Sequence, residues 1–146
     1  MTPPRRIVFD TNVLVSALLC HGSTPDLAFE LALNQYELIL SGEICQEIED
    51  VLRRPKIAKL LSWDTRQEFM EKLRGAAAFI SISSKIDVCR DSRDNMLLDL
   101  AVDGAASAVV TGDQDLLVLD PFRKIRILTP RQFIDVYGTP GAEIMM

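Results

Sequence analysis

Residues 5–10 read Arg5-Arg6-Ile7-Val8-Phe9-Asp10, an apolar run that ends in an aspartate. β-Branched and aromatic residues in such a run predict a strand that is covered on both faces. The pattern of residues 11–19 then favours a helix. The chain therefore begins with a buried strand that leads into a helix, and Asp10 lies at the junction.

The alternation of strand and helix continues along the chain. We expect further strands at residues 36–40, 79–82, 108–111 and 124–128. We expect further helices at residues 25–35, 42–54, 56–61, 64–78, 91–104 and 131–137, with Thr24 and Ser41 capping the first two, and a turn at residues 112–115. This order predicts a three-layer α/β/α sandwich with a mainly parallel central sheet of about five strands. In such sheets the ligand binds outside the carboxyl ends of the strands.

The length and composition fit one domain. The chain has 146 residues, 48% of them apolar, and we expect residues 1–146 to form a single domain with a core at about 6–136 and a mobile tail at 138–146. The apolar stretches are too short to cross a bilayer, and the N-terminus lacks the apolar region of a signal peptide, so we expect a cytoplasmic protein. Three cysteines without a Cys-x-x-Cys pair and a single histidine argue against a disulfide framework and a zinc site.

The net charge of −5 leaves two interpretations open. On the first interpretation nucleic acid is not the ligand, because proteins that bind the nucleic-acid backbone are usually basic. Alternatively, the acidic side chains are concentrated where a cation neutralises them. The positions of the individual acidic residues decide between these interpretations.

Two aspartates follow apolar strands. Asp10 ends the first strand, and Asp113 follows the expected strand Ala108–Thr111. The carboxyl ends of parallel strands meet at one edge of the sheet, so both carboxylates are expected there. The alternative for Asp10 is a simple helix cap, and the alternative for Asp113 is an ordinary polar turn.

Two further acidic residues fall on apolar helix faces. Glu47 is three residues after Ile44 and four before Val51, so it shares their inward face. Asp94 lies three residues before Leu97 and shares its face in the same way. A buried carboxylate is costly unless it is paired or binds metal. The alternatives are that Glu47 reaches water at the edge of the stripe and that Asp94 is a common acidic residue of a first helical turn.

Together the four carboxylates predict a site for a hard divalent cation. We find no inward base to match them, so their mutual repulsion requires a cation such as Mg²⁺ or Mn²⁺, which prefer oxygen ligands. A carboxylate-bound metal of this kind can activate water and stabilise the leaving oxygen of a phosphodiester.

The motifs resemble those of PIN-domain ribonucleases, in particular the group identified as toxin components of toxin–antitoxin pairs. The resemblance spans about residues 6–136 and depends on the combination of Asp10-Thr11-Asn12 with Thr111-Gly112-Asp113-Gln114-Asp115. It implies metal-dependent hydrolysis of single-stranded RNA. It also implies an antitoxin partner and a homodimer, to which apolar residues such as 76–80 could contribute.

The resemblance also assigns roles to residues. The acidic quartet of the family falls on Asp10, Glu47, Asp94 and Asp113, which would be both catalytic and metal-binding. Asn12 and Thr111 would support the site. Asp91 and Asp115 would bind the metal through water. One departure concerns Arg93, because relatives often carry an acidic pair where this chain has Arg93-Asp94.

The RNA needs cations, and the candidates are Arg5, Arg6, Arg53, Arg54 and Lys56. Arg53 and Arg54 end the helix that carries Glu47, where the alternative is an ordinary charged helix terminus. Two rival functions stay open at this point. A phosphatase of the haloacid dehalogenase type also places an aspartate after its first strand, but it needs a second aspartate where this chain has Asn12. The other rival is a catalytically idle PIN fold that serves as a binding module.

Overall fold

A parallel sheet with strand order β3-β2-β1-β4-β5 forms the centre of the computed structural model, which describes residues 4–138. The strands are β1 (Arg6–Phe9), β2 (Glu37–Leu40), β3 (Ala78–Phe79), β4 (Ala108–Val110) and β5 (Arg126–Leu128), and each neighbouring pair is parallel. The expected parallel sheet of about five strands is confirmed. β1 lies in the middle of it, and Ile7, Val8 and Phe9 are almost completely buried, as a strand covered on both faces should be.

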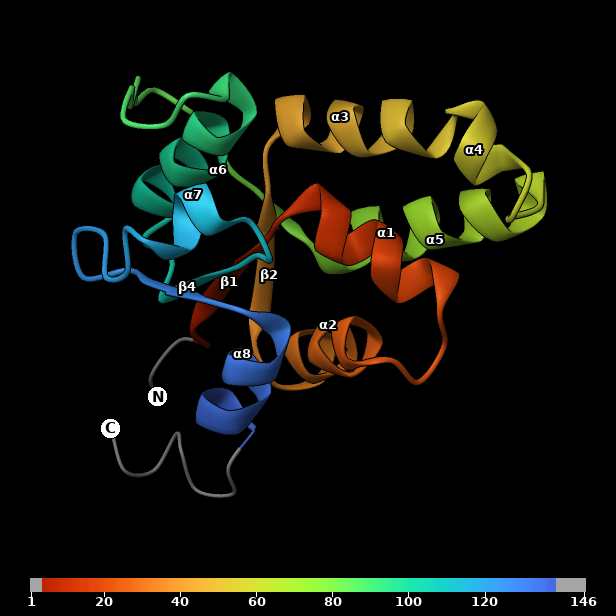
Figure 1. Ribbon diagram of the computed structural model, residues 1–146, viewed down its shortest axis with the longest axis horizontal. Coiled ribbons are helices and arrows are strands. Elements are labelled where there is room, and N and C mark those ends of the chain that lie inside the picture. Colours follow the sequence, from red (N-terminus) through yellow and green to blue (C-terminus); the bar gives the residue numbers. More distant parts are fainter. Residues whose placement is uncertain (1–3, 139–146) are drawn as a thin grey trace.

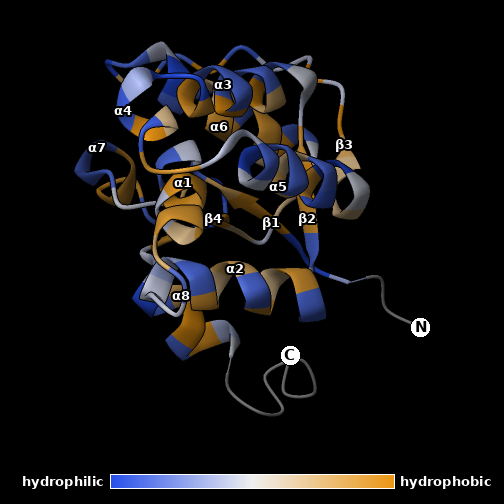
Figure 2. Cartoon of the chain, turned by 90° about the vertical axis from the view of Figure 1, so that its right-hand side faces the viewer, coloured by the Kyte–Doolittle hydropathy of each residue, from blue (hydrophilic) through white to orange (hydrophobic). Residues whose placement is uncertain are grey.

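Helices cover both faces of this sheet. In Figures 1 and 2 the helix α6 lies above the strands, while α2 and α8 lie below them. The helices are α1 (Thr11–Leu19), α2 (Thr24–Gln35), α3 (Gly42–Leu52), α4 (Pro55–Ala58), α5 (Trp63–Ala76), α6 (Ser92–Asp103), α7 (Gln114–Leu117) and α8 (Pro130–Tyr137). Figure 2 shows hydrophobic residues along β1 and β4, between the helical layers. The three-layer arrangement that the strand–helix alternation predicts is therefore confirmed.

An aromatic cluster packs α2 and α8 onto β1. The ring of Phe9 lies edge-on to Phe29 at 6.0 Å and to Phe133 at 5.9 Å between centroids. The hydroxyl of Tyr36 donates a hydrogen bond to the carbonyl oxygen of Tyr137 across this layer. Edge-to-face pairs of this kind add to the free energy gained by burying the rings. They hold β1 in place, and Asp10 follows this strand directly.

Backbone pairing continues one residue beyond β1 and β4. The register aligns Phe9 with Val110, and the amide of Asp10 donates to the carbonyl of Val110 at 2.9 Å. The amide of Thr111 donates in the same way to the carbonyl of Leu128 at 2.9 Å. The residues that follow the two strands are therefore held at the same edge of the sheet.

Some predicted boundaries were wrong by one to three residues. The cap of α2 is Ser23, whose hydroxyl accepts a hydrogen bond from the amide of Asp26, so Thr24 is already helical. The expected turn at residues 112–115 is instead the start of α7, because Asp113 caps a short helix. The strand expected at 79–82 is shortened to Ala78–Phe79. These boundaries depend on which local hydrogen bonds the tertiary structure permits.

The tail predicted to be mobile lies almost entirely outside the described residues. Within residues 4–138, no helix combines the length and the apolar character that crossing a membrane requires.

Candidate active site

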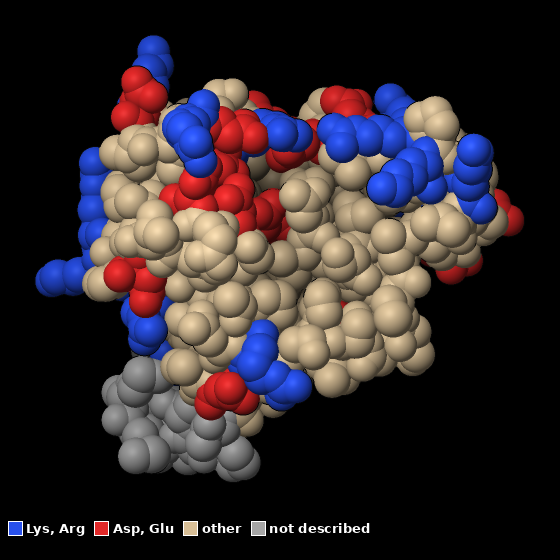
Figure 3. All heavy atoms as spheres, in the orientation of Figure 1, with Lys and Arg blue, Asp and Glu red and all other residues tan. Residues whose placement is uncertain are grey.

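A polar cleft of about 100 Å³ contains all four of the predicted carboxylates. Its lining consists of Asp10, Thr11, Asn12, Glu47, Val51, Asp91, Arg93, Asp94, Leu97 and Asp113. They come from the junction of β1 with α1, from α3, from the start of α6 and from the junction of β4 with α7. Figure 3 shows acidic side chains gathered in a hollow on this face. We call it the acidic cleft.

Thr111 joins the two strand-end aspartates. Its hydroxyl, which is completely buried, donates to Oδ2 of Asp10 at 2.7 Å and accepts from the amide of Asp113 at 3.0 Å. The other carboxylate oxygen of Asp10 accepts from the amide of Asn12 at 3.2 Å. Asp10 and Asp113 are therefore helix caps and cleft residues at the same time, so the simpler alternatives do not exclude a role in the cleft.

Burial governs the charge of Asp10. Its side chain is 8% exposed, and the loss of water around it raises its pKa. The hydrogen bonds from Thr111 and Asn12 oppose this effect, because they stabilise the ionised form. The nearby carboxylate of Asp113 raises the pKa of Asp10 further.

Asp94 is the most perturbed of the four carboxylates. It lies in the first turn of α6, is 6% exposed, and its Oδ2 is buried without a hydrogen-bond partner in the described part of the chain. Burial, followed by the adjacent carboxyl of Asp113 and the charge of Asp10, raises the pKa of Asp94 to about 7. An unpartnered buried carboxylate oxygen is unusual, since most buried polar atoms are satisfied.

This donor set fits a divalent cation. One carboxylate oxygen from each of Asp94, Asp113 and Asp115 lies within 4.8 Å of the other two. Asp94 also has the buried Oδ2 that lacks a hydrogen-bond partner among the described residues. Hard cations such as Mg²⁺ and Mn²⁺ take carboxylate oxygens as ligands and would relieve the repulsion among them. The buried oxygen of Asp94 is thus the atom whose environment a cation would most improve.

Glu47 enters the cleft from α3. Its side chain is 17% exposed, so most of it is withdrawn from water, as the apolar stripe predicts. Its Oε2 accepts a hydrogen bond of 3.1 Å from the hydroxyl of Thr11, which lies one residue after Asp10. Ser41 caps α3, as predicted, because its buried hydroxyl accepts from the amide of Ile44.

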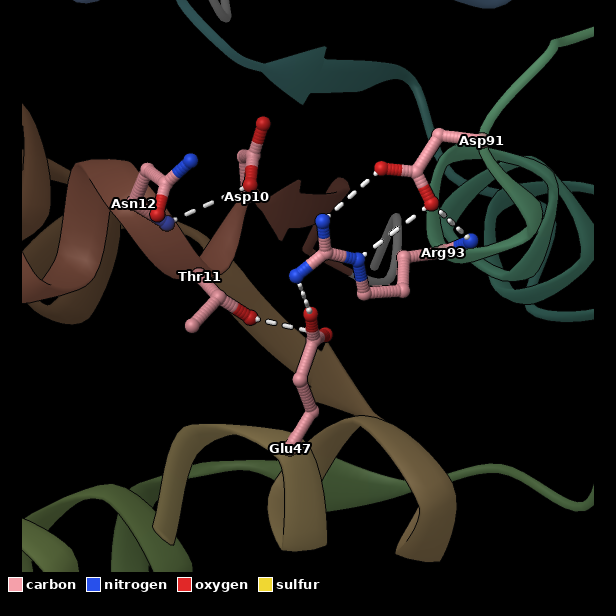
Figure 4. A network of polar contacts seen from close by, with 6 residues as sticks. All are labelled: Asp10, Thr11, Asn12, Glu47, Asp91 and Arg93. Atoms are coloured by element: carbon pink, nitrogen blue, oxygen red, sulfur yellow. Dashed lines mark hydrogen bonds and ion pairs between the residues drawn. The ribbon is translucent and has the colours of Figure 1, made fainter. Parts of the chain in front are cut away.

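The expectation that the cleft contains no base was wrong. The guanidinium of Arg93 lies between two carboxylates in Figure 4. Its Nη2 and Nε bond to Asp91 at 2.9 and 3.2 Å, and its Nη1 lies 3.8 Å from Oε1 of Glu47. These bonds hold the pKa of Asp91 below its usual range. Arg93 is visible in the sequence, but only the fold brings it to Glu47, which is on another helix.

The secondary acidic residues have partners of their own. Asp91 caps α6 by accepting from the amide of Arg93 at 2.9 Å, in addition to its ion pair with the same residue. Asp115 binds Arg90, whose Nη2 lies 2.9 Å from both carboxylate oxygens. Asn12 lines the cleft, but its contact with Asp10 comes from the backbone amide and not from its side chain.

Sequence reasoning missed the residues that position the start of α6. Asp99 is 8% exposed and accepts from the amide of Ile86 at 2.8 Å. The side chain of Asn95 accepts from the amides of Val88 and Cys89 and donates to the carbonyl of Cys89. These bonds tie the irregular segment 80–91 to α6. No sequence pattern indicates them, because the segment has no regular structure of its own.

Arg53 and Arg54 lie at the end of α3, away from the floor of the cleft. Both side chains are exposed, and Nη1 of Arg53 lies 3.9 Å from Oδ1 of Asp50. They do not line the acidic cleft.

The chain is similar to known proteins over most of its length. The family model of the PIN domain matches residues 6–115. The chain is 30% identical to the uncharacterized protein MJ1680 of Methanocaldococcus jannaschii, over 90% of this chain and 91% of that protein.

Two solved structures share the fold. PAE2754 from Pyrobaculum aerophilum superposes with a TM-score of 0.63 at 12% identity, covering 92% of this chain and 91% of that one. The second is VapBC2 from Rickettsia felis, whose structure was solved bound to a DNA fragment from the promoter. It superposes with a TM-score of 0.54 at 16% identity and covers 84% of this chain and 96% of that one.

Proposed function

Because the chain belongs to the PIN domain family, we propose that it is a divalent-metal-dependent endoribonuclease that hydrolyses phosphodiester bonds of single-stranded RNA. One observation carries the proposal. Asp10, Glu47, Asp94 and Asp113 come from four separate parts of the chain and line one cleft, in which Oδ2 of Asp94 has no partner among the described residues. Nucleases that depend on metal use such carboxylates to hold the cation that acts on the phosphodiester.

Each side chain of the proposed site has a defined task. Asp10, Asp94 and Asp113 would hold Mg²⁺ or Mn²⁺, which when bound supplies Lewis acidity toward the phosphodiester and the attacking water. Thr111 orients the carboxylate of Asp10 through its 2.7 Å hydrogen bond. The carboxyl of Asp94, with a pKa near 7, gives up its proton when the cation binds.

Glu47 completes the acidic lining from the opposite side of the cleft. Thr11 holds its carboxylate in place through the hydrogen bond of 3.1 Å. In the proposed reaction Glu47 lines the site from α3, and no side chain serves as the nucleophile. In the sequence the sole histidine is His21, and its ring is fully exposed beside Asp26, outside the cleft lining.

A basic ridge beyond the cleft supports the choice of a polyanionic substrate. The ridge consists of Arg53, Arg54, Lys56 and Lys59, all exposed, and Figure 3 shows basic side chains over α4 at the upper right. Within residues 4–138, Arg54, Lys56 and Lys59 make no ion pair. Unpaired cations on a chain of net charge −5 are suited to phosphates. Among the ridge residues, Arg53 and Arg54 directly follow the helix of Glu47 in the chain.

An exposed aromatic residue adjoins the ridge and supports a single-stranded substrate. Trp63 is 60% exposed, and the guanidinium of Arg66 lies 5.7 Å from the centre of its ring. Unpaired bases stack on such rings, whereas bases within a duplex cannot.

The same proposal includes the partners and the place of action. We place the protein in the cytoplasm as the toxin of a toxin–antitoxin pair, on the basis of the resemblance in its motifs and a fold shared with VapBC2. A homodimer is also part of the proposal. Phe79, on the edge strand β3, is 50% exposed and offers an apolar contact for it.

The test is RNA cleavage by matched aspartate variants. Asp10→Asn and Asp113→Asn remove a charge from the cleft but keep a good helix cap, so the fold should persist. Asp87→Asn changes an exposed aspartate outside the cleft and serves as the control. We expect Mg²⁺- or Mn²⁺-stimulated cleavage of single-stranded RNA by the parent and the control, and loss of at least about 100-fold in the cleft variants. Equal cleavage by all four proteins would contradict the proposal, because cleavage would then not depend on the carboxylates of the cleft. No metal-stimulated cleavage by the parent would also contradict it and would leave a binding module.

A further inference from the structure

The hydrogen bonds and ion pairs of the acidic cleft divide it into two sides. On one side Asp10, Asp94 and Asp113 interact with one another, through Thr111 and through their charges. On the other side Glu47 and Asp91 are the two carboxylates that the guanidinium of Arg93 contacts. Figure 4 shows this guanidinium between them.

Of the described residues that line the cleft, Arg93 is the one cation. A nuclease with two metal ions places them about 3.5–4 Å apart and shares carboxylates between them. Here the oxygens that a second ion would need on the side of Glu47 already face a permanent positive charge. An arginine keeps this charge at every accessible pH, and its planar fork matches carboxylate oxygens.

We propose that Arg93 takes the place of a second metal ion, so that the cleft binds a single divalent cation on the side of Asp10, Asp94 and Asp113. This inference rests on the proposed function and deepens it. The built-in cation holds Glu47 and Asp91 while the divalent ion is held by the remaining carboxylates. A guanidinium at this position also presents N–H donors to a phosphate oxygen.

The position of Arg93 on its helix argues that the contact is more than a chance surface pair. Arg93 is in the first turn of α6, where the helix dipole favours acidic residues and disfavours cations. Its side chain is 52% exposed, yet it extends toward Glu47 on α3 instead of into solvent. Asp91 bonds both the amide and the guanidinium of Arg93, which restricts the side chain to this direction.

The number of bound ions tests the inference without reference to catalysis. Titration with Mn²⁺ by calorimetry gives the stoichiometry, and electron paramagnetic resonance distinguishes an isolated Mn²⁺ from a coupled pair. The variants are Arg93→Gln, which removes the charge, and Arg93→Glu, which also adds a carboxylate. Arg126→Gln is the control, because Arg126 is likewise half-exposed and paired with one aspartate, Asp120, outside the cleft lining.

We expect one Mn²⁺ in the parent and in the control, and two coupled Mn²⁺ ions in both Arg93 variants. Two ions in the parent, or a single ion in both Arg93 variants, would overturn the inference. Either of those results would leave the proposed nuclease intact as long as RNA cleavage depends on Mn²⁺. Absence of Mn²⁺ binding in the parent would instead contradict the proposed function itself.

Discussion

The hydroxyl of Thr111 donates a 2.7 Å hydrogen bond to Oδ2 of Asp10, across 101 positions of the sequence. The same hydroxyl accepts from the amide of Asp113. One buried oxygen atom therefore sets the distance between the two aspartates that follow β1 and β4. The pairing of these strands brings Thr111 opposite Asp10, so the link is a direct consequence of the register of the sheet.

Replacement of this hydroxyl should affect both stability and cleavage. Thr111→Val keeps the shape but leaves an oxygen of Asp10 and the amide of Asp113 without a partner, which costs about 1–3 kcal/mol. Urea unfolding measures this loss. Thr111→Ser keeps the hydroxyl and is the matched control. We expect Thr111→Val to lose metal affinity as well, whereas unchanged stability and affinity would show that the hydroxyl is dispensable.

The pKa of Asp94 makes the stability of the metal-free protein depend on pH. Burial raises this pKa to about 7 from its ordinary value of 3.8, so between these values the folded protein holds a proton that the unfolded chain releases. The contribution of Asp94 is therefore fully present below pH 3.8 and is lost as the pH rises through about 7. Asp94→Asn mimics the protonated form, and we expect it to be more stable than the parent at pH 8 in a chelator. Chemical unfolding over this pH range measures the difference, and parallel pH profiles of the two proteins would contradict the assignment.

Binding of the cation should release the same proton. At pH 6 Asp94 is mostly protonated, so binding of Mg²⁺ must displace the proton and is weaker than at pH 8. Calorimetry in buffers of different ionisation enthalpy counts the protons released. We expect proton release at pH 6 that nearly disappears at pH 8. Release that does not change with pH would assign the proton to another group.

The basic ridge should determine how strongly salt weakens RNA binding. Each phosphate contact with single-stranded nucleic acid contributes about 0.7 to the slope of log K against log salt concentration. Arg54→Gln combined with Lys59→Gln removes two unpaired cations, so the slope should decrease by about 1.4. Lys85→Gln combined with Arg126→Gln removes the same charge elsewhere and is the control. Equal slopes for the two double variants would show that RNA does not contact the ridge.

Asn95 should hold the segment before α6 in place. Its side chain makes three hydrogen bonds to the backbone of Val88 and Cys89, and Asn95→Ala leaves these groups unpaired. We expect a loss of about 1–3 kcal/mol and faster hydrogen exchange in residues 86–91. Asn34→Ala on the exposed face of α2 is the control. Unchanged exchange would mean that the segment is held by packing alone.

The sequence by itself determined the class of fold and the acidic residues of the cleft. Apolar β-branched runs that alternate with amphipathic segments leave few arrangements that bury both, which is why the parallel sheet and its helices could be predicted. Asp10 and Asp113 could be predicted because parallel strands end at one edge. Glu47 could be placed because an acidic residue in an apolar stripe must face inward, and local periodicity carries that information.

Only the tertiary structure decided how these acidic residues are paired. The contact of Arg93 with Glu47, the link through Thr111 and the bonds of Asp99 and Asn95 to segment 80–91 all join parts of the chain that no local pattern relates. Hydrogen bonds and ion pairs depend on distances of a few tenths of an ångström, which are set by the packing of whole elements. The charge balance of the cleft, with a guanidinium on the side of Glu47, therefore follows from the fold and not from the residue pattern.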